Sequence, residues 1–131
     1  MSVLVVDASV IAPAVADAGA DGQAFRRRLR RETLAGPDLL RIEVLSVFRK
    51  RLRAGFLTAR QADVAAGQLL ELPVVEFPTA PLLRRAWALR ANVTSYDACY
   101  VALAEALGCP LLTADSRLAH APGTRCRIEL A

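Results

Sequence analysis

Short apolar runs alternate along this chain with longer stretches of helical pattern, and this alternation constrains the fold more than any other feature. Val3–Val6 is a β-branched run that predicts a buried strand. Three later segments, Val74–Phe77, Leu111–Thr113 and Arg127–Leu130, predict further strands. Strands that alternate with helices indicate a parallel sheet covered on both faces, so we expect an α/β fold of three layers, α/β/α.

Helices are expected between these strands. The first begins near Ile11. The second should bury Phe25, Leu29 and Leu34 and end at Gly36-Pro37, a strong stop signal. The remaining helices are delimited by capping residues and glycines: from Asp38 to Ala54 before Gly55, from the Thr58 and Gln61 capping box, from Thr79, and from Thr94 or Ser95 to Gly108.

The length of the chain predicts a single domain over 1–131, because 131 residues bury enough surface to fold unaided. Apolar residues make up 54%, yet each apolar run is short, which predicts neither a membrane span nor a secretory signal. Cys99, Cys109 and Cys126 are odd in number and form no C-x-x-C pair. We therefore expect reduced thiols and a cytoplasmic protein.

The charge balance favours a polyanionic partner. Seventeen basic residues against 13 acidic ones give a net charge of +4. A dense basic cluster begins with Arg26, Arg27 and Arg28 and continues to Arg31. It has two interpretations: a contact with a nucleic-acid backbone, or an ordinary solvated helix face. The same two interpretations apply to a second group: Arg49, Lys50, Arg51 and Arg53.

Four acidic residues stand where a parallel α/β fold binds ligands. Asp7 and Asp115 follow predicted strands at their carboxyl ends, the edge at which open parallel sheets bind ligands. Asp97 falls in the first turn of a helix, whose dipole favours an ionised carboxylate. Glu43 borders the apolar side of its helix. With no Lys or Arg within two residues of Asp7 or Asp97, such acids favour a hard divalent cation, Mg²⁺ or Mn²⁺, as their counter-ion.

Each acid taken alone also has an ordinary structural explanation. These explanations are an N-cap for Asp7, an ion pair with Arg41, Arg49 or Lys50 for Glu43, a place in a Thr94 cap for Asp97, and a turn with Ser116 for Asp115. The occurrence of all four acids together is what favours a metal site.

The segments that carry the acids resemble those of PIN-domain proteins, in particular the VapC-type toxins of bacterial toxin-antitoxin pairs: VLVVDASV, LLRIEVLSVFRK and TSYDACYVALAEALGCPLLTADSRL. The resemblance runs from Val3 to about Ile128, and no acid of the family's quartet is missing. It implies a three-layer PIN-like domain with a central parallel sheet, a homodimer, and an endoribonuclease dependent on Mg²⁺ or Mn²⁺. It also implies a small VapB-like antitoxin whose C-terminal segment wraps the toxin and blocks the acidic site.

The resemblance assigns roles to individual residues. The catalytic and metal-binding acids are Asp7, Glu43, Asp97 and Asp115. Ser9 and Thr113 match small hydroxyl positions that hold a water or a carboxylate, although ordinary helix-start and strand-end hydroxyls would explain them equally. Arg117 is either a phosphate contact or a surface arginine. For Trp87 and Tyr100 a place in the core, or in a dimer contact, is favoured over base stacking, and the lone His120 does not indicate zinc.

The hypothesis for the mechanism is attack by a metal-activated water, which leaves 5′-phosphate and 3′-hydroxyl ends. Two rival functions remain open from the sequence. One is a phosphoacceptor or phosphatase of flavodoxin-like architecture, which usually needs a lysine at the end of a late strand. The other is a catalytically silent module that binds RNA or a partner protein. The sequence names neither the RNA nor the cleavage site.

Overall fold

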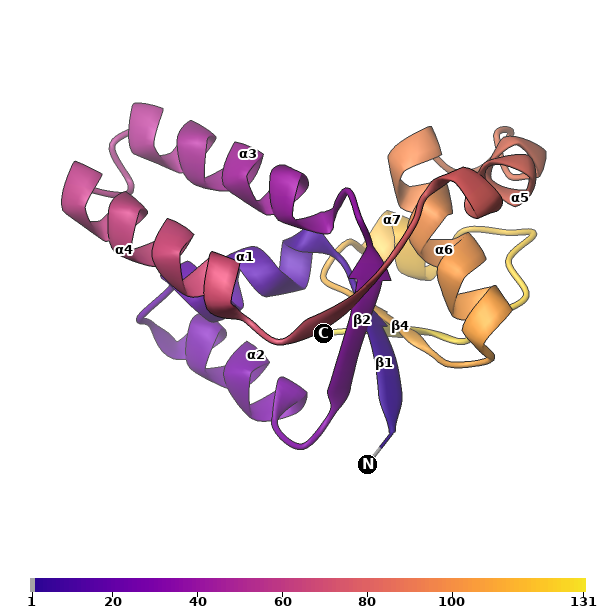
Figure 1. Ribbon diagram of the computed structural model, residues 1–131, viewed down its shortest axis with the longest axis horizontal. Coiled ribbons are helices and arrows are strands. Elements are labelled where there is room, and N and C mark those ends of the chain that lie inside the picture. The colour runs from indigo at the N-terminus through magenta and orange to yellow at the C-terminus, as the bar shows by residue number, and fades with distance from the viewer. Residues whose placement is uncertain (1) are drawn as a thin grey trace.

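A computed structural model describes residues 2–131, and its centre is a five-stranded parallel sheet (Figure 1). The strands are β1 (Val3–Val6), β2 (Thr33–Pro37), β3 (Val74–Phe77), β4 (Leu111–Thr113) and β5 (Ile128–Leu130). Their spatial order is β3-β2-β1-β4-β5, and every neighbouring pair is parallel. The α/β class and the parallel sheet predicted from the sequence are confirmed.

Helices cover both faces of this sheet. They are α1 (Ala8–Ala16), α2 (Ala20–Leu29), α3 (Leu40–Arg53), α4 (Ala59–Glu71), a 3₁₀ turn η1 (Ala80–Leu82), α5 (Leu83–Ala88), α6 (Ser95–Leu107) and α7 (Ser116–Ala119). Figure 1 shows α1 to α4 on one side of the sheet and α5 and α6 on the other. The result is the expected α/β/α arrangement, in which α6 packs on β1 and β2.

The strand order fixes where a site can form. The chain builds β1, β2 and β3 outward in one direction, then returns to place β4 and β5 on the opposite side of β1. The order therefore reverses between β1 and β4, where Val6 is in register with Leu112. Ligands of open parallel sheets bind at the carboxyl edge beside such a reversal. Asp7 and Asp115 lie there, just beyond β1 and β4.

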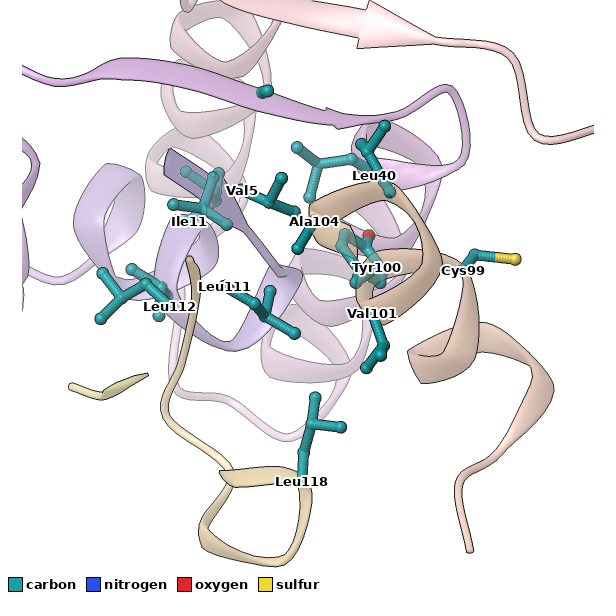
Figure 2. Close-up of a cluster of buried hydrophobic side chains, with 14 of the residues drawn as sticks. Val5, Ile11, Leu40, Cys99, Tyr100, Val101, Ala104, Leu111, Leu112 and Leu118 are labelled. Carbon is teal, nitrogen blue, oxygen red and sulfur yellow. The ribbon is translucent and has the colours of Figure 1, made fainter. Parts of the chain in front are cut away.

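The core is formed by the inner strands and the middle of α6. Residues 98–104 of α6 are all buried, so this helix is apolar around most of its circumference, as expected of a helix enclosed by the fold. Tyr100 is among the largest fully buried side chains. Figure 2 shows Tyr100 near Leu40, Val101 and Ala104, in the same buried cluster as Val5 of β1 and Leu111 of β4. This packing fixes α6, and with it the first turn that carries Asp97.

The prediction of a second helix ending at Gly36-Pro37 was wrong. Helix α2 ends at Leu29, and Leu34, Gly36 and Pro37 belong to β2. The chain turns at Arg31, whose φ is 71°, and then pairs in parallel with both β1 and β3. Tertiary pairing overrides a local helix-stop signal here.

Three local expectations also differ. Asp38 does not cap α3, because the N-cap is Leu39 and the Asp38 carboxylate accepts a hydrogen bond from the Thr79 hydroxyl. For the same reason Thr79 provides no side-chain cap to the helix after it. Trp87 is 67% exposed, so its place is not in the core.

Other capping signals are confirmed. The Thr58 and Gln61 capping box is present, Thr94 caps α6, and α6 ends at Gly108 in the left-handed conformation that glycine favours. No helix within residues 2–131 is both long and apolar enough to cross a membrane.

Candidate active site

Asp7 is held on both of its carboxylate oxygens by neutral donors. Its Oδ1 accepts the Ser9 backbone N–H at 3.1 Å and the Ser9 hydroxyl at 2.5 Å. Its Oδ2 accepts the Thr113 hydroxyl at 2.6 Å. Each hydroxyl is oriented in turn, because Ser9 Oγ accepts the Ala114 N–H and Thr113 Oγ1 accepts the Asp115 N–H. The N-cap interpretation of Asp7 is therefore correct, and Asp7 is also the centre of a network that joins β1 to β4.

Glu43 is held by a tyrosine rather than by a cation. Its Oε1 accepts the hydroxyl of Tyr100 at 2.6 Å, whereas Arg41 pairs with Glu76 on β3. This tyrosine lies one helical turn beyond Asp97 on α6. Sequence reasoning assigned Tyr100 to the core and missed the contact of its hydroxyl. The spacing between Asp97 and Tyr100 was the only signal in the sequence for this contact. That spacing does not reveal that α3, which carries Glu43, lies opposite.

Asp97 and Asp115 occupy the positions that the capping pattern predicts. The Asp97 N–H donates to the Thr94 hydroxyl, which caps the start of α6. Asp115 is the N-cap of α7 and accepts the Arg117 N–H at 2.9 Å. The Arg117 guanidinium is 3.9 Å from Asp115 and its side chain is 93% exposed. A pair this exposed contributes little stability, so Arg117 is free to contact another anion.

Asp97 links the four carboxylates electrostatically. Burial raises the pKa of Asp7, Glu43 and Asp97 above their usual values, and nearby negative charge raises each one further. Asp97 takes part in most of these interactions. Its charge raises the pKa of Asp7 and of Glu43, and the charge of Asp115 raises the pKa of Asp97. Hydrogen bonds from Ser9, Thr113, Tyr100 and Thr94 oppose the shifts and favour the charged forms.

This donor set has the chemistry of a site for a hard cation. Carboxylate oxygens are the protein ligands that Mg²⁺ prefers, and Mg²⁺ typically binds through one or two carboxylates while keeping several waters. No three Asp, Glu, His or Cys side chains in the described part of the chain are gathered closely enough to hold an ion by themselves. An ion bound to one or two of these acids, with water as its other ligands, would suit this donor set.

The basic cluster on α2 is not beside these acids. Arg26 donates to the backbone carbonyls of Ala14 and Asp17, and Arg28 pairs with Glu32 and Glu129. Glu32 immediately precedes β2, at the sheet edge opposite the carboxyl ends. Arg27 is exposed. Contact of these arginines with RNA stays a prediction, and for Arg26 and Arg28 it would compete with existing internal contacts.

Replacing Asp7 by asparagine should stabilise the metal-free protein, increasingly so as the pH rises. Asparagine caps a helix as well as aspartate does and carries no charge to bury. The pKa of Asp7 is raised by folding, so the stability that its protonated form contributes is complete below the ordinary value of 3.8 and is lost as pH rises through the folded value. Urea unfolding of both proteins in EDTA, from pH 3 to 8, measures the difference. If the difference in unfolding free energy between the two proteins shrinks as the pH rises, burial of the charged Asp7 carboxylate does not destabilise the protein.

The comparisons with known proteins bear on the family and the fold of the chain. The family model described as PIN domain matches residues 4–123. Ribonuclease VapC1 of Mycobacterium tuberculosis is 43% identical over 131 residues, covering 99% of this chain and 98% of the relative. The solved structure of M. tuberculosis VapC20, described as a sarcin-ricin loop cleaving toxin, has a TM-score of 0.71 at 18% identity and covers 93% of this chain and 96% of that one. DNA-bound VapBC from Salmonella typhimurium gives 0.64 at 17% identity, with 98% of each chain covered.

The chain belongs to the PIN-domain family. Within that family it is similar to the VapC ribonucleases over nearly its whole length.

Proposed function

We propose that this protein is a divalent-metal-dependent endoribonuclease and the toxin of a VapBC-type pair, acting in the cytoplasm as a single domain over 1–131. The observation that carries the proposal is that α3 and α6 bring Glu43 and Asp97 to Asp7 and Asp115 at the carboxyl edge of the sheet, close enough for Asp97 to raise the pKa of Asp7 and Glu43 and for Asp115 to raise that of Asp97. Hydrolysis of a phosphodiester bond is the reaction that such a set supports, and similarity to ribonuclease VapC1 supports RNA as the substrate.

The protein's own residues have distinct roles in this proposal. Asp7 uses three donors to fix its position and keeps one lone pair of Oδ2 unused by the hydrogen bonds described above. Tyr100 fixes Glu43 and favours its charged form. Asp97, which interacts with the other acids, is the central ligand. Ser9 and Thr113 act as positioning residues because they contact Asp7 rather than the reacting atoms.

A bound Mg²⁺ or Mn²⁺ would supply a water of lowered pKa and neutralise charge on the phosphate oxygens. Because the attacking group is water, the products should carry 5′-phosphate and 3′-hydroxyl ends. Arg117 would contact a neighbouring phosphate, which its 93% exposed side chain beside Asp115 supports.

A VapB-like antitoxin is the proposed partner, since the similar Salmonella structure is a VapBC complex. A homodimer stays an expectation from the family resemblance. Among the rival functions, the phosphatase is disfavoured because Lys50, the only lysine, lies on α3 rather than at a strand end. The catalytically silent module is disfavoured because all four acids are retained.

The test is cleavage of total cellular RNA by the purified protein with Mg²⁺ or Mn²⁺, in parallel with EDTA. We expect discrete cuts with 5′-phosphate ends that disappear in EDTA and return when the metal is restored. A 2′,3′-cyclic phosphate product, or cutting that survives EDTA, would rule out the proposed reaction. Failure to cut by a folded protein whose melting temperature rises with Mg²⁺ would instead favour the silent module.

A further inference from the structure

Two of the three cysteines lie together at the amino ends of β4 and β5. Cys109 and Cys126 line one cavity, which has a volume of about 360 Å³. Both are free thiols and both are partly exposed. Cys99 is instead buried on α6 and does not line this cavity. A small reagent can therefore reach the pair, and reaction of the pair can be distinguished from reaction of Cys99.

The register of β4 and β5 places the two cysteines opposite each other. Leu111 pairs with Ile128, and each cysteine precedes the first residue of its strand by two positions. The Leu111 N–H donates to the Arg127 carbonyl at 3.0 Å, so the parallel pairing begins immediately after the cysteines. Neighbouring strands are roughly 5 Å apart, and residues two apart along a strand point to the same face. Continuation of this register meets the Cα separation of roughly 4.4–6.8 Å that a disulfide requires.

Backbone contacts hold both cysteine segments against the end of α6. The Cys109 N–H donates to the Ala104 carbonyl at 3.1 Å. The N–H of Arg125, which immediately precedes Cys126, donates to the Glu105 carboxylate at 2.7 Å. Since Ala104 and Glu105 are adjacent on α6, one turn of this helix positions both segments. The two thiols are therefore brought together by the fold itself.

The surroundings of the thiols keep them protonated near neutral pH. Burial raises the pKa of Cys109, and burial together with the charges of Glu105 and Cys109 raises the pKa of Cys126 to about 11. The positive charge of Arg85 acts in the opposite direction. The effect of Cys109 on Cys126 also reflects their proximity. Because the thiolate is the attacking species, the pair should resist brief oxidation and react under sustained oxidation.

We propose that Cys109 and Cys126 form an intramolecular disulfide in the presence of a small-molecule disulfide oxidant, and that this bond locks β4 to β5. One cysteine loses its proton, and its thiolate attacks a sulfur atom of the oxidant and releases one small thiolate. The second cysteine thiolate then attacks the protein sulfur of the mixed disulfide and releases the other small thiolate. Both cysteines are oxidised, and the oxidant is reduced to two thiols that take up the two protons.

The bond would close a loop that carries part of the acid site. Residues 109–126 contain β4, Asp115 and the whole of α7. Closing this loop restricts the unfolded chain and so should stabilise the folded protein. The bond lies at the amino ends of the strands, whereas the acids lie at the carboxyl ends. The proposal does not depend on the proposed nuclease function, because its readouts are covalent state and stability.

The test uses Cys99→Ala, which retains only the two cysteines of the pair. The dilute protein is incubated with oxidised glutathione at about pH 8.5, where more thiolate is present, and is then digested with trypsin without reduction. We expect a monomer lighter by two hydrogen atoms and a disulfide between the peptides 91–117 and 126–127. The melting temperature should rise by roughly 5–10 °C and return to its starting value in dithiothreitol.

Two further proteins serve as controls. Cys126→Ser in the Cys99→Ala background has a single thiol, so it should take up at most one glutathione, with no rise in melting temperature. The unaltered protein should lose the same two hydrogen atoms and leave Cys99 to be alkylated after unfolding. Circular dichroism confirms that each protein is folded before oxidation, and the unaltered protein decides the test if Cys99→Ala does not fold.

Three results would overturn the disulfide: glutathione adducts on both cysteines without an internal bond, bonds only between molecules, or thiols that stay reduced in the folded protein while urea-unfolded protein oxidises. An internal bond that leaves the melting temperature unchanged, or lowers it, would show that β4 and β5 are not locked by it.

Discussion

RNA cleavage should fall by at least about a hundredfold when Asp97 is replaced by asparagine, which corresponds to roughly 2.7 kcal/mol of lost transition-state stabilisation. Asp97 is the carboxylate that interacts electrostatically with Asp7, Glu43 and Asp115. Its removal should weaken metal binding as well as cleavage. Its backbone contact with Thr94 is unaffected by the change, so the helix cap is preserved. Initial rates on one RNA, measured across a range of Mg²⁺ concentrations, give both effects.

The matched control for Asp97 is Asp63→Asn. Asp63 is exposed on α4, away from the carboxyl edge, and the same loss of charge there should leave the rate unchanged. If the two variants cleave equally well, Asp97 has no catalytic role.

Replacing Gly22 by alanine should lower the free energy of unfolding by about 3 kcal/mol, the upper part of the usual range for overpacking. A Cβ atom built at Gly22 lies 1.9 Å from the carbonyl oxygen of Asp17, far inside any permitted contact. That carbonyl also accepts a hydrogen bond from Arg26, so moving it aside would disturb a second contact. Urea denaturation monitored by circular dichroism measures the loss.

Gly67 is the control for this change. It is an exposed position inside α4, and a Cβ built there meets nothing within 4 Å. Gly67→Ala should therefore stabilise the protein by about 0.5–1 kcal/mol through helix propensity alone. Equal effects of the two substitutions would show that the junction of α1 and α2 is looser than the structure indicates.

The places of the four acids relative to strands and helices could be predicted because they follow from local pattern. A β-branched run followed by an acid predicts a strand end, and Thr94 and Gly108 bound α6 without reference to the rest of the fold. Strand β2 was missed because its five residues include Gly36 and Pro37, which locally indicate a stop. Its strand conformation depends on pairing with β1 and β3, and no local signal reports that pairing.

The hydrogen-bond and ion-pair partners of side chains also could not be predicted from the sequence. The bond between Tyr100 and Glu43 joins residues 57 positions apart, and it replaces the ion pairs considered for Glu43. The arginine cluster shows the same limit. Counting charge gave a basic helix, but only the structure distinguishes the internally bonded Arg26 and Arg28 from the exposed Arg27.

The hydroxyl network around Asp7 has a consequence for biosynthesis. Asp7 and Ser9 emerge from the ribosome first, whereas Thr113, which holds the other carboxylate oxygen, lies 106 residues later. Strand β4 must insert beside β1 before that bond can form. An incomplete nascent chain therefore carries acids without the arrangement that orients them. In a cell that makes this protein, the assembled site would therefore form only after nearly the whole chain has been translated.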